Sequence, residues 1–189
     1  MSSKELSKLT LAGMFAAMTF VCFAYLRLEI PMGLGLTGKL YLGYTFIILA
    51  ALLLGPKYGA LVGAIGLTLA DLLSGYVTSA PPTFLAKFIL GWAVGFIAHN
   101  IYHLASVTEH KHVLRIIVVA ALGGSLLNII TEPLIRYTFK IFILGQPHIM
   151  AYASAINCAI SMTLNNIIST FLAILLYKAL PTSILNKAR

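Results

Sequence analysis

The stretch LLLGPKYGALVGAIGLTLADLLSGYVTSAPPTFLAKFILGWAVGFIAH, residues 52 to 99, decides the fold. It contains two long apolar runs, which are preceded by a tight GPKYG turn at residues 55–59 and separated by the pair Pro81 and Pro82. A helix on the surface of a soluble protein carries a charged face, but this stretch has only three charged residues: Lys57, Asp71 and Lys87. The pattern predicts helices that lie in a membrane.

The composition of the whole chain agrees with this interpretation. Of the 189 residues, 60% are hydrophobic and 10% are charged, and the mean hydropathy is +0.96. A soluble domain has about 25% charged residues because it needs a hydrated surface, so lipid must be most of this chain's solvent. At about 20 residues per crossing, we expect an all-α, polytopic protein of the cell (plasma) membrane, with one integral membrane domain over residues 1–189.

Turn residues and charges divide the chain into six predicted membrane spans. The second is short for a full crossing, so we expect it to be tilted or to end inside the protein. Eight of the 13 basic residues fall on one side of the spans, which predicts that both termini are cytoplasmic. The same rule explains the net charge of +8 without a nucleic acid partner. The predicted spans are residues 9–26, 40–54, 58–74, 83–102, 113–139 and 150–180.

In the extracytoplasmic half of the predicted helices lie four charged residues: Asp71, Lys87, Glu132 and Arg136. Each costs at least ~2.5–3.5 kcal/mol in an apolar helix, so each needs a partner or a function. In one interpretation they form two neutralising pairs, Asp71 with Lys87 and Glu132 with Arg136. In the other, some of them line a polar cavity that is open to the outside.

Polar and aromatic side chains near these charges extend the candidate cavity. Asn128 lies one turn before Glu132, and Asn165 and Asn166 add amides in the last helix, although such amides often serve only helix packing. Aromatic rings at the same level fit either an interfacial belt or a heterocyclic ligand, and residues 27–39 could close over the cavity as a lid. The candidate substrate-binding residues are Lys39, Tyr41, Tyr44, Lys87, Trp92, Asn128, Glu132, Arg136 and Asn165.

The first helix carries two overlapping pairs of small residues at a spacing of four. Small residues let another helix approach closely, so these positions either pack against the same chain or dock onto a membrane partner. We assign the similar pairs Gly59 with Gly63 and Gly91 with Gly95 to internal packing. The candidate docking residues are Ala12, Gly13, Ala16 and Ala17.

Other chemistry finds no support in the sequence. His99 and His103 have the spacing of two ligands on one helix face, but no third ligand is near in sequence, so we predict no metal site. The chain has no GxxxxGK[ST] phosphate loop and no nucleophile–base motif, and we therefore expect neither ATP binding nor catalysis in this chain.

The runs LLLGPKYGALVGAIGLTLADLLSGY and PPTFLAKFILGWAVGFIAH resemble the substrate-binding S components of energy-coupling factor (ECF) transporters. The resemblance covers the whole chain and is most specific over residues 38–99, where it favours the subgroup of hydroxymethylpyrimidine, pyridoxine and riboflavin-like S components. Tyr44 departs from the pattern, because many relatives have an aspartate there.

The resemblance implies a vitamin-binding subunit whose pocket faces outside and is formed by the first loop and helices 4 to 6. It also implies docking through Ala12 and Ala16 onto a transmembrane T component. Two partner ATPase subunits would use the ATP, and the S component would topple within the membrane to release its cargo inside. Two carboxylates and three amides favour a neutral or weakly basic ligand, namely hydroxymethylpyrimidine or a vitamin B6 compound. The alternatives are pantothenate, riboflavin, or a stand-alone transporter coupled to ions.

Overall fold

Six α-helices and one short β-hairpin make up the computed structural model, which describes residues 3–31, 37–107 and 109–180. A π-helical turn, Ile97–Ile101, extends α4, and two 3₁₀ turns, Val77–Ser79 and Leu104–Ser106, lie in the connections. The main elements are α1 (Ser3–Tyr25), β1 (Leu28–Pro31), β2 (Thr37–Leu40), α2 (Gly43–Leu54), α3 (Pro56–Leu73), α4 (Ala80–Phe96), α5 (His110–Phe142) and α6 (His148–Ala179).

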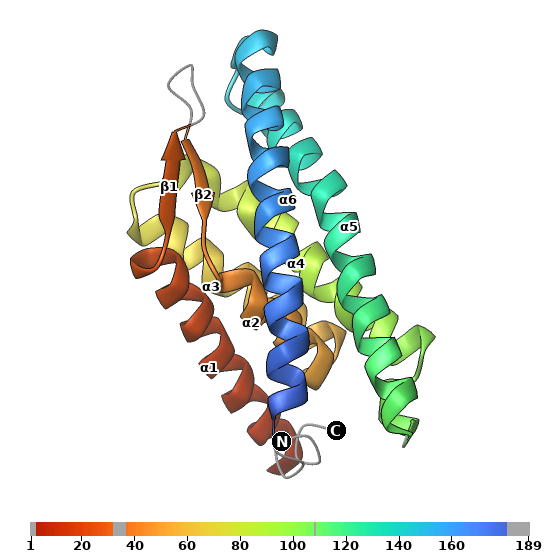
Figure 1. Ribbon diagram of the computed structural model, residues 1–189. Helices are drawn as coiled ribbons and strands as arrows, with labels where there is room; N and C mark the ends of the chain where they lie inside the picture. Colours follow the sequence, from red (N-terminus) through yellow and green to blue (C-terminus); the bar gives the residue numbers. More distant parts are fainter. Residues whose placement is uncertain (1–2, 32–36, 108, 181–189) are drawn as a thin grey trace.

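Four helical segments of the described chain are long and apolar enough to cross a bilayer: Glu5–Tyr25, Val77–Ile101, Lys111–Phe142 and His148–Ala179. The helices α2 and α3 are shorter or more polar, so six crossings stay a prediction. The amino end of α1 and the carboxyl end of α6 lie at one end of the molecule (Figure 1). The hairpin and the α5–α6 connection lie at the opposite end. That the first of these ends faces the cytoplasm is likewise a prediction.

The expectation of an all-α chain is wrong at residues 28–40, where an antiparallel hairpin follows α1. Leu28 pairs with Leu40, and Pro31 pairs with Thr37. The strands have four residues each, too few for a repeating pattern to appear in the sequence. The hairpin occupies the place that we assigned to a lid, and residues 32–36 of that segment lie outside the described residues.

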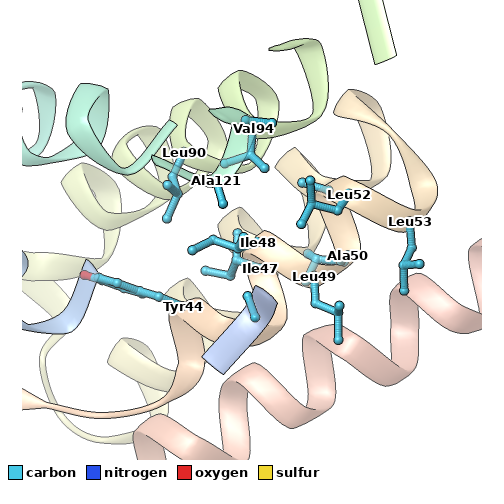
Figure 2. Packing of buried hydrophobic residues seen from close by; sticks show 14 of the residues in the cluster. Tyr44, Ile47, Ile48, Leu49, Ala50, Leu52, Leu53, Leu90, Val94 and Ala121 are labelled. Atoms are coloured by element: carbon cyan, nitrogen blue, oxygen red, sulfur yellow. The ribbon is translucent and has the colours of Figure 1, made fainter. Parts of the chain in front are cut away.

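The short helix α2 forms the centre of the protein. Every residue of α2 except Phe46 is buried, so the helix has no lipid-facing side. That it is tilted or ends inside the protein stays a prediction. Ile47, Ile48 and Leu52 share one buried apolar cluster with Leu90 and Val94 of α4 (Figure 2). At about 1.5 Å per residue, the 12 residues of α2 span roughly 18 Å.

The helices α3 and α4 make the closest contact in the bundle, and glycines allow it. A Cβ atom added to Gly91 would lie 2.1 Å from the carbonyl oxygen of Gly59, and one added to Gly63 would lie 2.7 Å from that of Lys87. A Cβ on Gly95 would lie 2.5 Å from the backbone of Pro56. These distances confirm that the glycine pairs of α3 and α4 serve internal packing.

Candidate functional site

A cavity of about 280 Å³ opens at the hairpin end of the molecule. It lies between the end of α1, the hairpin, the α3–α4 turn and the facing ends of α5 and α6. The residues that line it are Phe23, Thr37, Lys39, Tyr41, Leu67, Asp71, Tyr76, Ser79, Thr83, Arg136, Lys140, Ser154, Asn157, Cys158, Ser161 and Met162.

Three cations and one carboxylate line this cavity. Lys39 reaches it from β2, Arg136 and Lys140 come one turn apart from α5, and Asp71 comes from the end of α3. The Asp71 carboxylate accepts a hydrogen bond of 2.6 Å from the Thr83 hydroxyl, and Lys140 donates one of 2.5 Å to Ser154. The polar wall therefore carries more positive than negative charge.

An ionic network around the fully buried Glu132 and Lys87 lies behind the cavity and reaches it through Arg136. The Glu132 carboxylate accepts hydrogen bonds from Lys87 Nζ, from Arg136 at 2.9 and 3.1 Å and from Asn128 at 3.3 Å. Arg136 also donates a bond of 2.9 Å to Thr83. One carboxylate thus serves two cations, and its lone pairs are occupied within the protein.

The structure corrects one of the two ion pairs expected from the sequence. The pair of Glu132 with Arg136 is confirmed, but Lys87 pairs with Glu132 and not with Asp71. Lys87 lies about two turns into α4 and faces Glu132 of α5, whereas the carboxylate of Asp71 is bonded by Thr83 in the first turn of the same helix.

Tyr44 belongs to the buried network and not to the cavity wall. Its hydroxyl is bonded to Lys87 and lies 2.6 Å from the Met162 sulfur. Its ring lies 5.2 Å from that of Tyr41, edge to face. Tyr41 itself lines the cavity, so Tyr44 supports the cavity floor from behind.

Asn165 fastens the hairpin to α6. Its side chain accepts a hydrogen bond of 2.9 Å from the Tyr41 amide and donates one of 2.7 Å to the carbonyl of Lys39. Asn166 bonds the Met162 carbonyl within α6 and lines a separate apolar groove between α5 and α6. The two amides thus position backbone and do not reach the cavity.

The candidate residues therefore divide into three groups. Trp92 does not reach the cavity: it is 43% exposed on the outer surface of α4 and stacks on Phe96 at 4.8 Å. Lys39, Tyr41 and Arg136 line the cavity, whereas Tyr44, Lys87, Asn128, Glu132 and Asn165 lie behind its wall.

The sequence interpretation missed one polar wall of the cavity. Ser154, Asn157, Cys158 and Ser161 come from α6, at a spacing of three and four residues that places them on one helix face. This stripe was visible in the sequence. Lys140 was missed because it lies at the end of α5, where a lysine is equally well explained by the membrane interface.

Aromatic rings hold the cations at the mouth of the cavity. The Lys39 ammonium lies 2.9 Å from the centroid of the Tyr76 ring and 5.3 Å from that of Phe23. Arg27 pairs with Glu29 at 3.1 Å, and Tyr76 donates a bond of 3.0 Å to Glu29. Burial lowers the pKa of Lys39 to about 8, while the nearby Asp71 carboxylate opposes this shift.

The candidate docking residues on α1 point in two directions. Ala12 is buried, and the backbone of Ala16 lies 2.8 Å from where a Cβ on Gly66 of α3 would stand. Ala12 therefore packs inside the chain and Ala16, which is partly buried, packs its backbone against α3, while docking of a partner through this pair stays a prediction. Gly13 and Ala17 face outward, and a Cβ on Gly13 would meet nothing within 4 Å.

The described residues contain no group of three or more His, Cys, Asp or Glu that could hold a metal ion. The nitrogen Nε2 of His99 lies 3.0 Å from the Leu52 carbonyl oxygen, and the backbone at His103 is left-handed, with φ of 48°. The two histidines therefore belong to the end of α4 and its turn.

Comparisons with known proteins point to one class of membrane protein. No curated protein matches the chain. The S component of a bacterial ECF transporter has a similar structure, with 20% identity, a TM-score of 0.59 and coverage of 93% of this chain and 95% of that one. The S component for biotin from an ECF-type ABC transporter has 19% identity, a TM-score of 0.61 and coverage of 94% and 95%. The sequence profile of one family matches residues 3–182, and the chain belongs to that family, the ECF-type riboflavin transporter S components.

Proposed function

We propose that this chain is the substrate-binding subunit of an ATP-driven vitamin importer in the cell membrane. The observation that carries the proposal is the polar cavity, which opens at one end of a bundle of apolar helices. A concave site with a few converging polar groups and flanking rings is suited to a small ligand. The S-component family and the biotin-binding neighbour support the same function.

The size of the cavity favours a compact vitamin. Its volume of about 280 Å³ is just below the roughly 300–1,000 Å³ that is usual for ligand sites. A single-ring or linear vitamin suits this volume better than a flavin. The sequence favoured a neutral or weakly basic ligand partly because of Glu132, Asn128 and Asn165. These three side chains form hydrogen bonds within the protein. Asn166 lines a separate groove, so the preference for hydroxymethylpyrimidine or vitamin B6 over pantothenate now rests on Asp71 alone, which lines the cavity.

We further propose that a T component and two ATPase subunits complete the transporter. The outer face of α1, here defined as Gly13, Met14, Ala17, Met18 and Val21, is exposed and apolar. Its small residues would let a partner helix approach closely. ATP would be bound and hydrolysed by the ATPase subunits, because this chain has no phosphate loop.

Transport by proteoliposomes tests the proposal. We expect vitamin uptake only when the T component, the ATPase subunits and ATP are all present. Ala17→Trp should abolish uptake and leave vitamin binding unchanged, because it blocks only the outer face of α1. The control is Ile130→Trp, which adds the same ring at a position on α5 that is 68% exposed. Ion-driven accumulation by the chain alone would instead show a stand-alone transporter.

A further inference from the structure

The cavity holds more positive charge than its own residues neutralise. Lys39, Arg136 and Lys140 line it against the single carboxylate of Asp71. Behind the wall, Glu132 is matched by Lys87, and at the mouth Glu29 is matched by Arg27. Two positive charges at this end of the molecule therefore have no counter-charge among the described residues.

Such an excess is costly in a partly buried site between membrane helices. The free energy of two uncompensated cations falls when an anion takes the place of the water that hydrates them. Hydrogen bonds between a charged donor and a charged acceptor are about twice as strong as neutral ones. Arg136 is suited to this, since its guanidinium bonds Glu132 and Thr83 on one side and lines the cavity on the other.

We propose that the ligand of this cavity carries an anionic group, a carboxylate or a phosphate, which binds between Lys39, Arg136 and Lys140. This inference rests on the proposed function and names the class of vitamin that the site takes. The three cations come from two directions, Lys39 from the hairpin and the other two from α5. An anion between them joins the hairpin to the helical bundle.

The rest of the ligand would lie against the remainder of the cavity wall. Phe23, Tyr41, Leu67 and Met162 supply apolar surface there. Ser154 and Asn157 on α6 supply hydrogen-bonding groups. The site is therefore suited to an amphiphilic acid with one charged end, and not to a cation or to a wholly neutral ring.

Matched pairs of acids and neutral analogues test the inference by isothermal titration calorimetry on the purified chain in nanodiscs. Pantothenate is compared with pantothenol, biotin with biotinol, nicotinate with nicotinamide, and pyridoxal 5′-phosphate with pyridoxal. Hydroxymethylpyrimidine and riboflavin complete the panel. We expect at least one acid to bind, and to bind at least tenfold more tightly than its neutral analogue. Whether that acid is a carboxylate or a phosphate identifies the source of the charge.

The other outcomes contradict different proposals. If a neutral member binds as tightly as its acid, or if only hydroxymethylpyrimidine or riboflavin binds, the anionic class is wrong and the vitamin-binding function stands. If no member of the panel binds, both proposals are wrong.

Variants locate the charge that the acid meets. Lys140→Met and Lys39→Met should each reduce the preference for the acid at least tenfold and leave affinity for the neutral analogue within twofold. Lys57→Met is the matched control, because it removes one positive charge from an exposed position at the start of α3. An unchanged preference in both cavity variants would overturn the inference. Circular dichroism of each variant distinguishes lost binding from lost folding.

The pH dependence of binding supplies an independent measurement. The pKa of Lys39 is about 8, set by burial and by its charged neighbours Asp71, Arg27, Glu29 and Arg136. Raising the pH from 7 to 9 should therefore weaken binding of the acid about tenfold, since the lysine loses its charge and the carboxylate does not change. In Lys39→Arg the affinity should stay constant over this range. A tenfold fall in that variant as well would show that another group titrates.

Discussion

Replacing Glu132 by leucine is expected to destabilise the folded protein by about 3–5 kcal/mol, the usual cost of removing one partner of a buried ion pair. The side chain is fully buried and bonds Lys87, Arg136 and Asn128. Its loss leaves two cations without a counter-charge among apolar helices. Unfolding by sodium dodecyl sulfate from mixed micelles, followed by circular dichroism, measures the effect.

Two further variants make this result specific. Glu109→Leu removes an exposed carboxylate and should change the free energy of unfolding by less than about 0.5 kcal/mol. The double variant with Lys87→Met and Glu132→Leu should recover part of the lost stability, because it removes one of the stranded cations. A double variant as unstable as the sum of its single variants would show that Lys87 and Glu132 do not interact.

Replacing Gly91 by alanine is expected to destabilise the protein by about 1–3 kcal/mol or more, as overpacking of a close contact does. The added Cβ atom would stand 2.1 Å from the carbonyl oxygen of Gly59. Backbone atoms cannot turn aside as a flexible side chain can, so α3 and α4 would have to move apart. The same unfolding measurement tests this.

The matched control is Gly13→Ala on α1, where the added atom meets nothing within 4 Å. There the substitution should raise the free energy of unfolding by up to about 1 kcal/mol, because alanine favours the helix more than glycine does. Equal effects at the two positions would show that helix propensity, and not the contact of α3 with α4, determines the result.

The helices could be predicted from the sequence because their signal is local and repeated. Apolar runs broken by GPKYG and by Pro81 and Pro82 give the right number and order of helices. The hairpin could not be predicted in this way. Its strands pair Leu28 with Leu40. The hairpin is also held by hydrogen bonds between Asn165 and the backbone of Lys39 and Tyr41, and Asn165 lies more than 120 residues further along the chain.

The candidate site was predictable in its residue types but not in their partners. Spacing on one helix gave the pair of Glu132 with Arg136, since residues four apart share a face. Whether Lys87 meets Asp71 or Glu132 depends on how α4 is rotated against α3 and α5, and this rotation follows from the glycine contacts of α3 with α4. The outward position of Trp92 has the same origin.

The shortness of α2 has an electrical consequence. A helix of roughly 18 Å cannot reach both faces of a hydrocarbon layer about 30 Å thick. With the exposed Lys57 next to its carboxyl end at the cytoplasmic membrane surface, as we propose, the amino end, beside Tyr41 and Tyr44, would lie within the layer. A ligand whose anionic group binds between Lys39, Arg136 and Lys140 in this cavity would then carry its charge across part of the membrane potential. A full crossing is worth about 2.3 kcal/mol per charge at 100 mV, so a polarised cell, negative inside, would hold such an anion more weakly than a depolarised one.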